Sequence, residues 1–171
     1  MKKNDPMPKT AKSAPKTALK LDPLDLQLAN ALQQDARLSI RELGRRLGVS
    51  APTISDRLSR LESAGVIQSY GAVVSLAALG YGVIAFVGVF DTSDKMAEVD
   101  KWAAQNPYVL ECHHLTGRFA AILKVAVTDI TALNTLVMQL VDMGVQCDTS
   151  IVLQSPVPHK LITVNPHETE R

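Results

Sequence analysis

The sequence is poor in several residue types that would mark it for particular roles. Its 171 residues include two cysteines and one tryptophan, and aromatic side chains make up 4 %. Two cysteines are too few for a disulfide framework, and they are not spaced like metal ligands. No apolar run approaches the roughly 20 residues of a membrane span, and the basic start lacks the apolar segment of a secretory signal. We therefore expect a soluble protein of a reducing compartment with no membrane partner.

Net charge is close to balance, but the charges are not spread evenly. The first 20 residues carry six lysines and one acidic residue, residues 21–71 carry six arginines against six carboxylates, and the remainder is net negative. Residues 1–20 show no hydrophobic periodicity, so we predict a disordered basic tail. Such a tail either keeps the protein soluble or contacts nucleic-acid phosphates.

Residues 21–71 are predicted to form three short helices. Each opens with a short polar side chain that caps free backbone N–H groups: Asp22, Ser39 and Ser50. Pro23 suits the first turn of the first helix, and Glu42 completes a capping box with Ser39. Gly48 and Gly65 end the second and third helices.

The second and third helices have the pattern of a helix-turn-helix. On the third helix, Ile54, Leu58 and Leu61 fall within one arc and face the other two helices. Five arginines lie between residues 41 and 60, a concentration suited to phosphates and guanine edges. A helix-turn-helix normally lays its second helix in the major groove of DNA. The alternatives are an ordinary three-helix packing unit and a helix-turn-helix that has lost DNA binding.

The predicted DNA-binding side chains are polar or charged and lie on the outward side of this unit. They are Ser39, Arg41, Arg45, Ser50, Thr53, Asp56, Arg57 and Arg60. Those from residue 53 to residue 60 are expected to face the groove, and those at 41 and 45 the DNA backbone. Two local ion pairs at i,i+4 spacing are also expected, from Glu42 to Arg46 and from Asp56 to Arg60.

After a linker at residues 72–82, the pattern changes to alternating strands and helices. Strands are predicted at 83–90, 109–115, 119–127 and 145–153, with helices at 94–105 and 128–143. The order βαββαβ is the ferredoxin-like arrangement, a four-stranded antiparallel sheet with two helices on one face. The uncovered face most simply packs against a second copy of the chain.

The predicted fold class is therefore α+β. A winged helix-turn-helix domain at residues 21–71 precedes a ferredoxin-like domain for effector binding and oligomerisation at 83–158, and residues 159–171 are a C-terminal tail.

Four segments carry a family resemblance: LDPLD at the start of the first helix, LSRLESAGVI around the end of the third, LTG at residues 115–117 and TSIVL at 149–153. Together they resemble the Lrp/AsnC family of bacterial and archaeal transcription regulators over roughly residues 21–158. The resemblance implies a cytoplasmic, nucleoid-associated homodimer, often assembled into octamers. It also implies binding to double-stranded DNA and sensing of a small molecule, commonly an amino acid, between subunits near the turn after the second strand.

The resemblance further implies effector-binding residues at that turn and on the last strand. They are Thr116, Gly117, Arg118, Phe119, Ala120, Cys147 and Thr149. Ala120 stands where the family's Gly-x-x-Asp turn has its aspartate, and Cys147 replaces one of two alternating threonines. An apolar or sulfur-containing amino acid, an altered ligand orientation and no ligand at all therefore stay open.

A metal or haem site is one interpretation of the adjacent residues Cys112, His113 and His114. Neighbours on a strand point to opposite faces, so His113 does not join the other two, and two ligands fall short of the four of a structural zinc site. We predict no metal and no cofactor.

An enzyme is the alternative function, because some Lrp/AsnC-like proteins decarboxylate sirohaem. Those enzymes tend to have a histidine- and arginine-rich, aromatic segment around the second and third strands. Here ECHHLTGRFAAILKV has one arginine and one phenylalanine. We therefore expect a regulator and not an enzyme.

Overall fold

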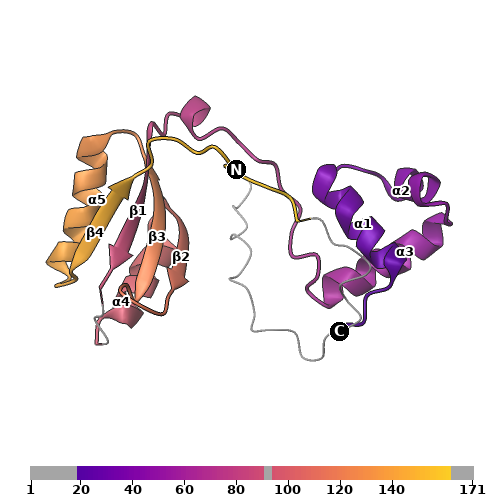
Figure 1. Ribbon diagram of the computed structural model, residues 1–171, viewed down its shortest axis with the longest axis horizontal. Helices are drawn as coiled ribbons and strands as arrows, with labels where there is room; N and C mark the ends of the chain where they lie inside the picture. Colours follow the sequence, from indigo (N-terminus) through magenta and orange to yellow (C-terminus); the bar gives the residue numbers. More distant parts are fainter. Residues whose placement is uncertain (1–18, 91–93, 163–171) are drawn as a thin grey trace, which may run out of the picture. The chain divides into compact units, whose positions relative to one another are not determined.

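The structure is a computed structural model that describes residues 19–90 and 94–162. The described chain falls into two compact units (Figure 1), residues 19–72 with 159–162, and residues 73–158. Almost all of the predicted basic tail lies outside the described residues. Within these ranges, no helix is long and apolar enough to cross a membrane.

The first unit contains the three predicted helices, α1 (Pro23–Gln34), α2 (Ile40–Leu47) and α3 (Ala51–Ser63). Their apolar faces meet in one small core, made of Leu28, Leu32, Leu43, Ile54 and Leu61. Gly48 ends α2 with φ 69°, a left-handed conformation that glycine adopts without strain. Beyond α3 the chain forms no strand before residue 83, so no β-wing follows the three helices in this structure.

The predicted N-caps are confirmed, but the capping boxes differ from the prediction. Asp22 accepts a hydrogen bond from the N–H of Asp25 at 2.9 Å, and the Asp25 carboxylate accepts one from the N–H of Asp22 at 3.0 Å. Ser39 Oγ accepts from the N–H of Glu42 at 3.2 Å, whereas the Glu42 carboxylate accepts from arginines. The complete box is therefore at α1, and the box at α2 is only half formed.

The second unit has the predicted βαββαβ order. Its elements are β1 (Val83–Val89), α4 (Met96–Gln105), β2 (Val109–His114), β3 (Ala121–Val127), α5 (Ile130–Asp142) and β4 (Cys147–Ile151). All strand pairs are antiparallel, and the sheet order is β2-β3-β1-β4. The α+β fold class predicted from the sequence is confirmed.

Both helices of this unit pack on one face of the sheet (Figure 1). Alternate residues of β1 (Ala85, Val87 and Val89) are buried beneath them, together with Leu123 of β3. Phe86 points to the other face and remains 38 % exposed. One face of the sheet is therefore the core of the unit, and no helix of the described chain covers the other face, where Phe86 lies.

The C-terminal segment, predicted to be a tail, returns to the first unit. The side-chain amide of Gln33 on α1 donates to the carbonyl of Ile162 at 3.0 Å and accepts from the N–H of Ile162 at 3.2 Å. This reciprocal pairing holds the last described residues beside α1. Residues 163–171 lie outside the described chain.

Candidate DNA-binding and effector sites

The outward face of the helix-turn-helix combines α3 with the start of α2. Asp56 and Arg41 are exposed, and neither forms an ion pair within the described ranges. Ser50 caps α3 by accepting from the N–H of Thr53 at 3.4 Å, and the two hydroxyls lie 2.8 Å apart. Thr53 and Asp56 lie in the N-terminal half of α3, the part of a helix-turn-helix that enters the major groove, and Arg41 lies at the start of α2.

Two arginines of α3 turn away from this face and bind the start of α1. Arg57 donates to the carboxylates of Asp22 at 2.5 Å and Asp25 at 2.7 Å, and Arg60 donates to the second oxygen of Asp25. The Asp25 side chain is completely buried, so its charge is stabilised by these donors and by the N–H of Asp22.

The pKa values of this cluster follow from the same contacts. The guanidinium of Arg57 lowers the pKa of Asp22 below its ordinary value. Burial alone would raise the pKa of Asp25, but hydrogen bonds from the N–H of Asp22, from Arg57 and from Arg60 lower it overall. The two carboxylates are therefore ionised at neutral pH.

The two arginines of α3 that pair with α1 do not lie where the sequence predicted them. Arg57 and Arg60 were expected in the groove, yet in the free protein both are engaged with carboxylates of α1. The expected pair of Asp56 with Arg60 is replaced by Arg60 with Asp25. Sequence reasoning missed Asp25, although its position three residues after an N-cap aspartate is the spacing of a capping box.

The arginines of α2 share one carboxylate. Glu42 accepts from Arg45 at 2.6 Å and from Arg46 at 3.1 Å, so the predicted pair with Arg46 is confirmed and Arg45 is added to it. Hydrogen bonds from both arginines lower the pKa of Glu42 to about 2. Arg45 stays 73 % exposed, which leaves its guanidinium accessible to solvent.

The predicted effector turn lies between β2 and β3. Its ends are closed by a hydrogen bond from the N–H of Leu115 to the carbonyl of Ala120 at 2.8 Å, and the N–H of Ala120 donates to Val89 at 2.8 Å. Gly117 has φ 114°, which favours glycine, and Thr116 beside it is exposed. The turn is thus joined by a backbone hydrogen bond to the end of β1.

Arg118 and Phe119 form a cluster with residues that the sequence did not point to. The guanidinium of Arg118 lies 5.4 Å from the ring centre of Phe90 and 5.3 Å from that of Phe119, within cation–π range. The Arg118 Nη2 is also 3.9 Å from a carboxylate oxygen of Asp148 on β4. The Phe119 ring lies over Gly88, where a Cβ would approach it to 2.7 Å. The turn therefore presents a cation, a carboxylate and two aromatic rings together.

The other two predicted effector residues lie on the opposite face of β4. Cys147 pairs with Val89 and Thr149 with Val87, and both valines are buried beneath the helices. Directly paired residues share a face of the sheet, so Cys147 and Thr149 point toward the helices, away from Asp148. Burial raises the pKa of the Cys147 thiol. Within one chain, the structure brings Arg118 and Phe119 together but not these two.

The histidines beside Cys112 each have an acidic neighbour. His113 Nε2 lies 3.2 Å from Glu111, and His114 Nε2 lies 2.8 Å from Asp100 on α4. Cys112 itself packs against the core of the unit. Within the described part of the chain, no group of three or more metal-binding side chains comes together.

Comparison with known proteins connects both units to one family. A profile described as winged helix-turn-helix DNA-binding matches residues 21–68, and the Lrp/AsnC ligand binding domain profile matches residues 84–162. The regulatory protein AsnC of Haemophilus influenzae is 30 % identical over 141 residues, which cover 80 % of this chain and 94 % of that protein. The chain belongs to the Lrp/AsnC family.

Solved structures of similar regulators have the same fold. A Neisseria meningitidis transcriptional regulator in complex with L-methionine superposes with a TM-score of 0.75 and 30 % identity over 81 % of this chain and 93 % of that one. A Mycobacterium tuberculosis feast or famine regulatory protein, also complexed with L-methionine, gives 0.75 and 28 % over 84 % and 99 %. This Lrp/AsnC chain is accordingly a DNA-binding transcription regulator with a ligand-binding domain.

Proposed function

We propose that this Lrp/AsnC protein acts as a homodimer on double-stranded DNA, and that an amino acid bound at the turn between β2 and β3 alters its affinity for that DNA. The observation that carries the proposal is the exposed face of the helix-turn-helix, where Arg41 and Asp56 have no ion-pair partner among the described residues. A side chain that is not paired within the domain contacts DNA without first breaking an internal bond.

The DNA contacts divide into two kinds in this proposal. Thr53 and Asp56 lie on the groove side of α3, while Arg41 and Arg45, with the capping serines at 39 and 50, lie toward the backbone. Arg57 and Arg60 act through Asp25, because their guanidinium groups fix the angle of α3 against α1. Both arginines therefore contribute to DNA binding by positioning α3.

A second copy of the chain fits the uncovered face of the sheet. Phe86 is exposed there and Ile84 and Ile122 beside it are half-buried. Phe86 pairs with Lys124 and Ser150 on the neighbouring strands, so a symmetric partner would cover apolar and polar side chains of this face together. Two copies would carry two α3 helices, which suits a pseudo-palindromic DNA site. Assembly beyond the dimer, to an octamer, belongs to the same proposal.

The turn offers complementary charges for a free amino acid. Arg118 is placed to bind a carboxylate, and Asp148 is placed to bind an ammonium group. Asp148 thereby supplies the negative charge that Ala120 does not. The rings of Phe90 and Phe119 favour an apolar or sulfur-containing side chain. The relatives solved with L-methionine make methionine the first ligand to test.

Salt dependence of DNA binding tests the phosphate contacts. Fluorescence anisotropy with labelled DNA from beside the protein's own gene should give a slope of log affinity against log salt that becomes about 0.9 shallower in Arg41→Ala. Lys101→Ala removes an equal charge from an exposed position on α4 and should leave the slope unchanged. Equal slopes in wild type and Arg41→Ala would contradict the assigned contact.

Calorimetry tests the effector. Titration with each of the twenty amino acids should reveal binding of at least one, and Arg118→Gln and Asp148→Asn should each weaken it by about tenfold or more. Lys101→Ala again serves as the control. No heat of binding with any amino acid would overturn the effector part of the proposal and leave the DNA part standing.

A further inference from the structure

A cavity of about 550 Å³ lies between the end of α4 and the start of α5, in the ligand-binding unit. It is far from the turn at Gly117. Tyr108 hydrogen-bonds through its carbonyl to Ala126 near the end of β3, whereas the turn enters β3 at Ala121. Ala121 and Ala126 are five residues apart along β3, about 17 Å at 3.3 Å per residue. The cavity and the turn are therefore two separate places on one sheet.

The cavity is lined by neutral side chains. Trp102 and Tyr108 contribute aromatic rings, Leu136 contributes a buried aliphatic wall, and amide side chains complete the rim. Among the residues that the structure describes, no aspartate, glutamate, lysine, arginine or histidine lines it. Small-molecule sites in proteins have volumes of this order and the same mixture of apolar wall and few polar groups. A charged ligand would find no counter-ion among these lining residues.

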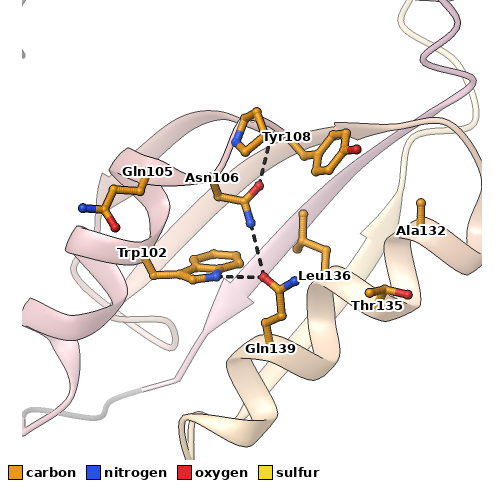
Figure 2. Close-up of a pocket in the computed structure, with 9 residues that line it drawn as sticks. Trp102, Gln105, Asn106, Tyr108, Ala132, Thr135, Leu136 and Gln139 are labelled. Carbon is orange, nitrogen blue, oxygen red and sulfur yellow. Dashed lines mark hydrogen bonds between the residues drawn. The ribbon is translucent and has the colours of Figure 1, made fainter.

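A chain of hydrogen bonds fixes the orientation of one amide in the cavity. The indole N–H of Trp102 donates to Gln139 Oε1 at 2.9 Å, and the Asn106 amide donates to the same oxygen at 3.4 Å. Asn106 is itself held because its Oδ1 accepts from the N–H of Tyr108 at 3.0 Å. Figure 2 shows both bonds meeting at the oxygen of Gln139, with the nitrogen turned toward the side of Leu136.

That arrangement determines which way the side-chain nitrogen of Gln139 points. Two donors require the oxygen where it is, so the amide does not gain by flipping. Its NH₂ group has no hydrogen-bond partner among the described residues. The cavity thus presents an oriented donor beside two aromatic rings, which is the complement of a flat molecule with a single hydrogen-bond acceptor.

We propose that this cavity is a second ligand site, distinct from the amino-acid site at the turn, and that it takes neutral planar molecules bearing a carbonyl-type acceptor. The ring of the ligand stacks against Trp102 and Tyr108, and its acceptor receives a hydrogen bond from Gln139 Nε2. A zwitterionic amino acid is a poor ligand for this site because both of its charges would be unpaired.

Trp102 is the chain's single tryptophan, so its indole N–H gives one resonance that reports on the cavity directly. Full-length protein is titrated with benzamide, a neutral ring with an acceptor, and with benzamidine, the cationic molecule of the same shape. L-phenylalanine is the zwitterionic control. Benzamide should shift the resonance saturably and bind about tenfold more tightly than benzamidine. L-phenylalanine should leave the indole resonance in place.

The matched variant is Gln139→Glu, checked for folding by circular dichroism. Its carboxylate still accepts from Trp102 and Asn106, but it has no donor to offer. The preference should reverse, with benzamidine now favoured over benzamide. Absence of a saturable shift with benzamide in the wild type would overturn the proposal. An unchanged preference in the variant would do so as well, because the rings alone would then account for binding.

Discussion

Asp25, at the start of α1, accepts a hydrogen bond from Arg57 of α3 through a carboxylate that is completely buried. The same side chain closes the capping box of its own helix by accepting from the N–H of Asp22. One residue therefore fixes the start of α1 and the angle of the DNA-facing helix at once. Because the arginine is itself partly exposed, the contact lies at the edge of the core and not within it.

Replacing Asp25 by asparagine should destabilise the helix-turn-helix unit. The substitution keeps the shape but removes the charge that balances Arg57 and Arg60, and we expect a loss of about 2–3 kcal/mol. Hydrogen exchange of α1 and α3 amides in the full-length protein measures this loss. Asp56→Asn, an isosteric change at an exposed aspartate without an ion pair in the described structure, should leave exchange unchanged. Equal exchange in the two variants would contradict the role of Asp25.

The same ion pairs predict how stability depends on pH. Asp22 and Asp25 both have pKa values below the ordinary value of 3.8, so their contribution is fully present above that value. It is lost as the pH falls through the lowered values in the folded state, because the unfolded chain then binds protons more readily. Acid titration followed by exchange of α3 amides should show a fall in stability below about pH 4. The fall should be shallower in Asp25→Asn.

Arg57→Lys separates positioning from phosphate binding. Lysine keeps the charge, but it replaces the planar guanidinium, whose Nη1 donates to both Asp22 and Asp25, by a flexible ammonium group. We expect weaker DNA binding with an unchanged salt slope, because the phosphates lose no positive partner. The measurement is the anisotropy titration described above. A slope about one unit shallower in Arg57→Ala than in Arg57→Lys would show instead that the charge of residue 57 neutralises a phosphate in the complex.

The sequence was sufficient for the order of elements because caps, apolar periodicity and glycine stops are local signals. It was insufficient for the partners of Arg57 and Arg60, because those contacts join residues more than 30 positions apart. Helical spacing predicts Asp56 as the partner of Arg60, but tertiary packing brings the buried Asp25 to Arg60 instead. Likewise, period-2 alternation placed Cys147 and Thr149 on one face of β4, but only the register with β1 reveals that this face is covered by helices.

Gly44 illustrates how packing overrides helix propensity. Propensity alone predicts that alanine at this position of α2 would stabilise the protein by about 1 kcal/mol. A Cβ at Gly44 would lie 2.7 Å from the carbonyl oxygen of Val49, a backbone atom in the turn. We therefore expect no gain from Gly44→Ala, and a loss of about 1–3 kcal/mol from Gly44→Val in chemical denaturation. A stabilised Gly44→Ala would indicate that the turn shifts at little cost.

Gly88 leaves room for the Phe119 ring at the effector turn, so a larger residue there should change the turn. An added Cβ would lie 2.7 Å from the Phe119 ring, which is a side chain and is free to rotate away, unlike the backbone atom at Gly44. Gly88→Ala should therefore displace Phe119, and with it the contact to Arg118, while the sheet itself stays intact. We expect weaker binding of the amino-acid effector in calorimetry with DNA affinity in the absence of effector unchanged. Gly71→Ala, where an added Cβ meets nothing within 4 Å, is the matched control. If both variants bind the effector like the wild type, the position of Phe119 does not matter for the site, and the cation–π cluster is only a feature of the free protein.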